Sequence, residues 1–226
     1  MDVCWRIARS WLGGLLLLGG ACSRGDAAPI DHPAGAPAPS ASSSSALPPR
    51  KEPAGCGSSV VAQPGDSFAV TSQRCYGSRT YHEWLMAHNH HEKAKALRAG
   101  ETLDIPPFAT LARERVAAQW APLVPAIAEA YARYRNVEPD IEKQLRGQRG
   151  MGSYRPDARA KAELETAAGA LRPVVTRLRE AGVRTQKFAQ ALADFERLAK
   201  GEGSFSTDYA TEEIHQSFSY GIDALH

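Results

Sequence analysis

The sequence lacks the features that define several large classes of protein. Neither sign of charge dominates: 27 Lys and Arg residues face 25 Asp and Glu residues, and a net charge of +2 gives no electrostatic basis for binding nucleic acid. The apolar run at residues 11–18 is far shorter than the roughly 20 residues that a membrane-spanning helix needs. No Cys follows Cys75 and only two His residues follow His91, so the C-terminal half lacks a thiol for a cysteine peptidase and enough ligands for a zinc peptidase.

The remaining composition is that of an ordinary globular protein. The chain has 226 residues, of which 43% are hydrophobic and 23% are charged. These values predict one or two modest domains once any processed or flexible part is set aside.

The first residues have the pattern of a secretory signal. Arg6 and Arg9 precede the short apolar run, and the small residues at 19–21 lead directly to Cys22. Small residues before a Cys resemble the bacterial lipobox, which implies a lipoprotein signal peptide at residues 1–21 and a lipidated Cys22. The alternative is simple secretion, with Cys22 as an ordinary thiol.

Residues 22–57 are rich in Ala, Pro, Ser and Gly and contain few apolar side chains. Such a segment cannot bury enough surface to offset the entropy of ordering, so we expect a disordered linker. The residue after Cys22 is Ser23 and not the Asp that often retains lipoproteins at the inner membrane. We therefore expect an exported, membrane-anchored lipoprotein of a bacterial cell envelope, held at the outer membrane and facing the periplasm.

Residues 58–107 predict a small module of strand, helix, helix and strand. An apolar run at residues 59–62 indicates the first strand, and the turn at residues 64–66 leads to a helix that Gly77 ends. Thr80 and Glu83 have the spacing of a capping box, which predicts that a second helix starts there. Alternation over residues 101–105 indicates the closing strand.

This order and these residues resemble the LysM family, a small carbohydrate-binding module. The opening Pro-Gly-Asp of that family is present at residues 64–66, and its Tyr-Gly at residues 76–77. Its closing Leu-x-x-Gly-Gln-x-Leu-x-Ile-Pro corresponds to residues 97–106, with Glu101 at the Gln position. Ala69, Thr71 and His90 depart from a common Trp, a common aliphatic residue and a common Pro of the family.

The resemblance implies a shallow groove that binds N-acetylglucosamine-containing glycans. The groove would lie between the first strand–helix loop and the loop before the second strand. A structural role is the alternative for each lining residue, because Asp66 can cap a helix and Phe68 and Leu97 can belong to the core. The residues that the resemblance places in the groove are Gly65, Asp66, Ser67, Phe68, Asn89, His90, Ala94 and Leu97.

Two further residue types in this region suggest covalent or metal chemistry. Cys56 and Cys75 remain after export to an oxidising compartment, which favours a disulfide over two free thiols. A histidine cluster, with Glu83 or Glu92 nearby, could in principle bind a metal, but an ordinary loop has the same composition. We expect no metal and no cofactor. The clustered histidines are His82, His88, His90 and His91.

Residues 108–226 have apolar residues at helical spacing and predict an all-α bundle of about four helices. We expect Pro122 and Pro125 to bend or break the first helix and Pro173 to do so in the second. No catalytic motif is recognisable: Glu163 is predicted to lie on a solvated face, and His215 has only a surface pairing with Glu212 or Glu213. The role of this helical domain stays open.

The whole chain is thus predicted to be an α+β protein without catalytic residues. We expect it to bind peptidoglycan glycan strands through a single LysM module, to attach to a membrane through its lipid, and to use the bundle as a scaffold or as a docking site for an envelope protein. The alternative is a peptidoglycan hydrolase, or an activator of one, that the module targets to its substrate.

Overall fold

The computed structural model describes residues 56–92, 97–146, 148, 150–202, 205–206 and 210–226. Four of the expectations above fall at least partly outside these residues. They are the signal peptide at 1–21, the lipidated Cys22, most of the linker at 22–57, and Ala94 of the groove.

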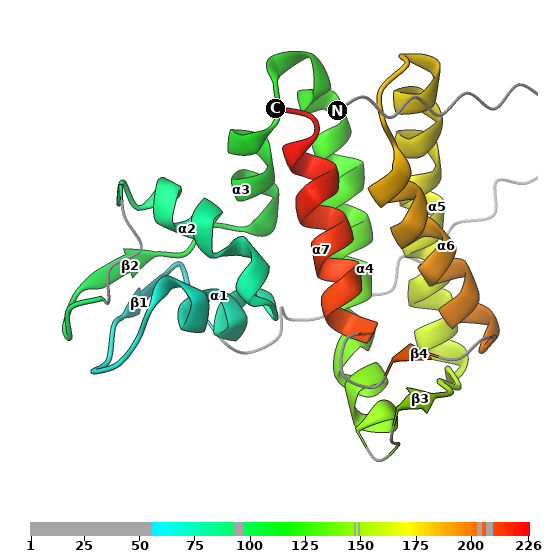
Figure 1. Ribbon diagram of the computed structural model, residues 1–226, viewed down its shortest axis with the longest axis horizontal. Coiled ribbons are helices and arrows are strands. Elements are labelled where there is room, and N and C mark those ends of the chain that lie inside the picture. Colours follow the sequence, from blue (N-terminus) through cyan, green and yellow to red (C-terminus); the bar gives the residue numbers. More distant parts are fainter. Residues whose placement is uncertain (1–55, 93–96, 147, 149, 203–204, 207–209) are drawn as a thin grey trace, which may run out of the picture. The chain divides into compact units, whose positions relative to one another are not determined.

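The first part of the described chain has two short strands, two α-helices and one 3-10 helix. Strands β1 (Ser59–Val61) and β2 (Thr102–Asp104) pair in antiparallel fashion, with Val60 opposite Leu103. Between them lie three helical elements, shown at the blue-green end of Figure 1. These are α1 (Phe68–Tyr76), the 3-10 helix η1 (Arg79–Tyr81) and α2 (His82–His88).

The turn before α1 and the end of α1 form at the predicted glycines, but the N-cap of α1 is a different residue from the one predicted. Gly65 has φ = 88°, which a type II turn over residues 63–66 requires, and Gly77 ends α1 with φ = 81°. The N-cap of α1 is Ser67, whose hydroxyl accepts a hydrogen bond from the Val70 N–H, and not Asp66 as the sequence suggested.

The predicted capping box of the second helix does not form. The Thr80 hydroxyl donates instead to Glu212, 132 residues further along the chain, at 2.6 Å. Ser78 caps the 3-10 turn by accepting from the Thr80 N–H at 3.0 Å, and α2 follows without a side-chain cap of its own. A long-range contact has therefore replaced the local one.

The rest of the chain is a helical bundle with a small second sheet, and the protein as a whole is α+β. Among its described residues there are five α-helices and one 3-10 helix, against the four or so helices predicted, and the second sheet was not foreseen. The helical elements are α3 (Phe108–Arg115), η2 (Ala118–Leu123), α4 (Val124–Leu145), α5 (Ala158–Glu180), α6 (Gln186–Lys200) and α7 (Ala210–Asp223). The short strands β3 (Met151–Gly152) and β4 (Phe205–Ser206) pair in antiparallel fashion.

The prolines lie both at a helix start and inside helices. Pro122 lies in η2, and Pro125 lies in the first turn of α4, where a missing N–H costs nothing. Pro173, which was expected to bend or break its helix, does not break it, because α5 continues through it from Ala158 to Glu180. No helix among the described residues is both long and apolar enough to cross a membrane.

One apolar core connects the first part of the chain with the helices. Tyr81 of η1 is fully buried, and its ring lies 5.4 Å from the ring of Phe108 and 5.7 Å from that of Tyr131. The Phe108 and Tyr131 rings stack at 3.7 Å. Phe218 of α7 then contacts both of these rings edge-on. The segment before residue 107 is thus packed into the bundle.

Polar contacts reinforce the same junction. The Tyr131 hydroxyl donates to the Tyr76 carbonyl at 2.6 Å, and the Tyr76 hydroxyl donates to the Pro106 carbonyl at 2.7 Å. A side chain at Gly77 would overlap the guanidinium of Arg135 on α4. The Tyr-Gly pair that the sequence placed in the first module therefore also forms its contact with α4.

Candidate functional site

The two loops predicted to form a groove lie side by side. The Leu97 N–H donates to the Asp66 carbonyl at 3.2 Å, and the Gly100 N–H donates to the Ala62 carbonyl at 2.9 Å. The two loops also have the same type of turn. Asp66 and Glu101 each follow a glycine with positive φ, and each carboxylate accepts the N–H of the residue three positions before it.

Three of the predicted groove residues are parts of the structure beneath the surface. The Asp66 carboxylate accepts from the Gln63 N–H at 2.9 Å and from Arg74 at 3.2 Å. These bonds lower the pKa of Asp66, chiefly through the Gln63 N–H, against the opposing effect of burial. Phe68 and Leu97 are 2% and 7% exposed, so both belong to the core.

Asn89 joins α2 to β2. Its amide nitrogen donates to the Leu85 and Asp104 carbonyls, both at 2.9 Å, and its oxygen accepts from the Asp104 N–H at 2.8 Å. Three bonds to the backbone use most of the capacity of the side chain. Asn89 therefore positions the loop and is poorly placed to bind a ligand.

The remaining residues predicted for the groove are the accessible ones. Gly65 and His90 are exposed, and Ser67 is half-buried. His90 has φ = 58°, the left-handed conformation in which non-glycine residues are uncommon. A ligand here would meet backbone groups of two tight turns, a hydroxyl and an imidazole, which is a set suited to hydrogen-bonding a polar ligand.

The histidine cluster is divided among separate partners. His88 contacts Glu114 at 2.9 Å and Asp104 at 3.3 Å, while His91 contacts Glu101 at 3.0 Å. Burial opposes the charged form of His88, but the two carboxylates raise the pKa of its imidazole overall. Within the described part of the chain, no three His, Cys, Asp or Glu residues gather as a metal site would require.

The predicted disulfide between Cys56 and Cys75 is confirmed. The two Cα atoms lie 5.3 Å apart, within the usual range for such a bond. The bond joins the start of the described chain to the last turn of α1. It also forms one edge of a pocket that the sequence did not predict.

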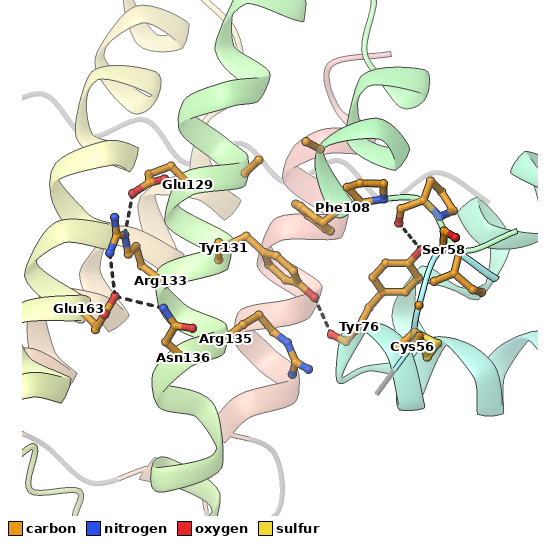
Figure 2. A pocket seen from close by; sticks show the side chains of 18 residues that line it. Cys56, Ser58, Tyr76, Phe108, Glu129, Tyr131, Arg133, Arg135, Asn136 and Glu163 are labelled. Carbon is orange, nitrogen blue, oxygen red and sulfur yellow. Dashed lines mark hydrogen bonds and ion pairs between the residues drawn. A yellow bond between two sulfur atoms is a disulfide. The ribbon is translucent and has the colours of Figure 1, made fainter. Parts of the chain in front are cut away.

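This pocket lies between the start of the described chain, the segment at 105–109 and helix α4 (Figure 2). Its volume is about 570 Å³, within the range of small-molecule sites. One side is apolar, and the opposite side carries charged groups of α4 and α5. The lining residues used below are Ile105, Pro106, Phe108, Ala128, Glu129, Tyr131, Ala132, Arg133, Asn136 and Glu163.

The polar side of the pocket is a row of opposite charges. Arg133 donates to Glu129 at 2.6 Å but reaches Glu163 only at 3.4 Å, and Asn136 also reaches Glu163 at 3.4 Å (Figure 2). Glu163 is 8% exposed, so the prediction that it lies on a solvated face is wrong. Both bonds end on Oε2, and no donor among the described residues pairs with Oε1. The buried Glu163 carboxylate thus accepts only two long hydrogen bonds from the described residues.

The sequence contained a faint signal for this row. Glu129, Arg133 and Asn136 recur at spacings of four and three, which places them on one face of a helix. The same spacing is typical of a solvated face. Only the packing of α5 against α4 brings Glu163 to that face.

A second buried polar group lies deeper, between α4, α7 and η1. His215 is fully buried, and its Nε2 lies 2.6 Å from Glu138, which also pairs with Arg135. The Tyr81 hydroxyl lies 3.2 Å from His215 Nδ1. The predicted surface pairing of His215 with Glu212 or Glu213 is therefore wrong. The Glu212 carboxylate instead accepts hydrogen bonds from Ser78 and Thr80.

The burial of His215 predicts a pH-dependent stability. Burial, and then the charge of Arg135, lower the pKa of His215 from 6.5 to about 3. The folded state therefore binds this proton less readily than the unfolded state does, and its stabilising effect is lost as the pH falls from 6.5 towards 3. We expect the free energy of unfolding to be roughly 2 kcal/mol lower at pH 5 than at pH 7 from this group alone.

Urea denaturation at several pH values, on wild type and on His215→Gln, measures this effect. The variant should lose the contribution of His215 to the pH slope, whatever its stability at pH 7. His88→Gln serves as the opposite control: the pKa of His88 is raised, so His88 stabilises the folded protein at low pH and its loss should steepen the slope. An unchanged slope in His215→Gln would contradict the prediction.

Comparisons of this chain with protein-family models, with curated proteins and with solved structures find no match. The functional evidence is therefore the local geometry: two tight turns in contact with each other, and a pocket that joins an apolar side to a row of charges.

Proposed function

We propose that this protein is a non-catalytic lipoprotein of a bacterial cell envelope that binds the N-acetylglucosamine-containing glycan of peptidoglycan. Residues 58–107 form the binding module, of the strand–helix–helix–strand type found in the LysM family. The lipid on Cys22 attaches the chain to the outer membrane, on its periplasmic side. The bundle is a scaffold or a docking site for an envelope partner.

The observation that carries the proposal is the contact between the two loops. The resemblance to LysM requires the first strand–helix loop and the loop before the second strand to flank one groove. The hydrogen bond from the Leu97 N–H to the Asp66 carbonyl brings these loops together. The antiparallel pairing of β1 with β2 holds them there.

The accessible groups also suit the proposed ligand. Exposed peptide groups near Gly65, the Ser67 hydroxyl and the His90 imidazole can exchange hydrogen bonds with acetamido and hydroxyl groups. A shallow site of this size binds weakly when it acts alone. Attachment to a membrane beneath the polymer raises the effective concentration and compensates for weak affinity.

Substitutions at the accessible groove residues test the proposal without removing structural contacts. Ser67→Asp keeps an N-cap acceptor but places a charge in the groove, and His90→Gly removes the imidazole while tolerating positive φ. We expect the double variant to bind N-acetylglucosamine tetramer at least tenfold more weakly than wild type. Titration followed by NMR, on the full chain with Cys22→Ser to block lipidation, measures this affinity.

The matched control is Asp157→Ser, which exchanges the same two residue types at the N-cap of α5. This control should bind the tetramer as wild type does. Sedimentation with purified sacculi repeats the comparison on the intact polymer. If wild type binds neither the tetramer nor sacculi, the module has only the architecture of a glycan binder and the proposal fails.

Glu163 gives specific support to the alternative function of a hydrolase. It is a buried carboxylate in a pocket close to the proposed binding module. A zymogram on a peptidoglycan gel decides between the two functions. A clearing band that disappears in Glu163→Gln would replace the non-catalytic proposal with hydrolysis.

A further inference from the structure

We propose that the pocket beside α4 binds the zwitterionic amino-acid group of a short peptide, as found on the peptide stems of peptidoglycan. The choice of this peptide source rests on the proposed function. The ligand chemistry itself is argued from the pocket, in which a guanidinium, two carboxylates and an amide lie beside an apolar side (Figure 2).

The polar row is arranged to receive both charges of an amino acid. Glu163 Oε1 has no donor among the described residues and can accept hydrogen bonds from an ammonium group. Arg133 and Asn136 lie next to it and can donate to a carboxylate. Their present bonds to Glu163 are 3.4 Å long, well beyond the 2.7–2.9 Å of a strong charge-assisted bond. A ligand can therefore replace them at little cost.

The apolar side fits an aliphatic chain attached to that group. The stacked rings of Phe108 and Tyr131 form part of this side. Ala128 and Ala132 of α4 also line the pocket, and their small side chains leave room there. A ligand with an aliphatic chain and a zwitterionic end matches both sides.

Peptidoglycan supplies such a ligand when its stem contains diaminopimelate. The side chain of that residue is a short aliphatic chain ending in an ammonium and a carboxylate on one carbon. A lysine stem carries the ammonium but lacks the carboxylate. Comparison of the two stems therefore tests the contribution of the positive side of the row, separately from that of Glu163.

The probe is the free tripeptide L-Ala-γ-D-Glu-meso-diaminopimelate, titrated into the full chain with Cys22→Ser by isothermal calorimetry. We expect binding that weakens at least tenfold in Glu163→Gln and at least fivefold when lysine replaces diaminopimelate. The matched control is Glu165→Gln, two residues along α5, where the side chain is 60% exposed and lies outside the pocket. Ala132→Leu, which fills the pocket without removing a charge, should also abolish binding.

Two further titrations separate this inference from the proposed function. N-acetylglucosamine tetramer should bind wild type and Glu163→Gln equally, because it occupies the groove and not the pocket. If the tetramer binds but the tripeptide does not, the pocket inference is overturned and the groove proposal stands. If only the tripeptide binds, the reverse holds. Free norleucine binding as tightly as the tripeptide would overturn the peptide source in favour of a free amino acid.

Discussion

Replacing Glu138 with Gln is expected to lower the free energy of unfolding by about 3 kcal/mol. Glu138 is 2% exposed and carries the negative charge that faces Arg135. The His215 imidazole is neutral because burial keeps its pKa low, so it donates to Glu138 but brings no charge to the site. Without Glu138, the guanidinium of Arg135 would remain at the junction without its counter-charge. Urea denaturation at pH 7 measures the loss.

Glu142→Gln is the matched control, one helical turn along α4. Its carboxylate is 44% exposed and reaches Arg146 only at 3.8 Å. Exposed pairs of this kind contribute little, so we expect a change below about 0.5 kcal/mol. Equal losses in the two variants would mean that the Arg135–Glu138 pair adds nothing beyond an ordinary surface pair.

Removal of the disulfide is expected to have a comparable effect. The double variant Cys56→Ser, Cys75→Ser should lose about 3 kcal/mol of stability, because the bond closes a loop between residues 19 apart in sequence and so restricts the unfolded chain. Thermal unfolding followed by circular dichroism measures the change in melting temperature. Dithiothreitol should lower the melting temperature of wild type by a similar amount.

The double variant is its own control for the reductant. Dithiothreitol should leave its melting temperature unchanged, since the described part of the chain contains no other disulfide. If wild type melts at one temperature with and without the reductant, then either the bond does not form in solution or it closes a loop that is already ordered in the unfolded state.

Features that depend on a few neighbouring residues were predictable from the sequence. The turn before α1 needs Gly65, and the end of α1 needs Gly77, because both positions have positive φ. The disulfide followed from two cysteines left in an exported chain. Each of these inferences requires only local geometry or the chemistry of the compartment.

Features that depend on packing between distant elements were not predictable. Thr80 and Glu83 had the spacing of a capping box, but the Thr80 hydroxyl bonds Glu212 on α7. His215 and Glu163 looked like surface residues because their neighbours in sequence are charged. Each became buried only when another helix covered its face, and periodicity along one helix cannot reveal which face a second helix covers.

The predicted groove was foreseeable in part. The sequence identified the two loops through a resemblance, and those loops lie together. It could not separate accessible residues from structural ones, because Asp66 and Asn89 are residue types that serve equally well in turns and in binding sites. Their hydrogen bonds to the backbone assign them to the structure and leave Gly65, Ser67 and His90 as the accessible surface.

The disulfide also determines how the molecule would carry mechanical tension. Under the proposed anchoring, movement of the membrane against the polymer pulls on the chain at Cys56. Without the bond, that pull would peel β1 from β2 one hydrogen bond at a time, since β1 is the first element after Cys56. The bond passes the load directly to Cys75, beside the Tyr76 carbonyl that Tyr131 of α4 holds. Tension from the membrane would thus enter the module at the last turn of α1, which is fixed to α4, and the pairing of β1 with β2 would be spared.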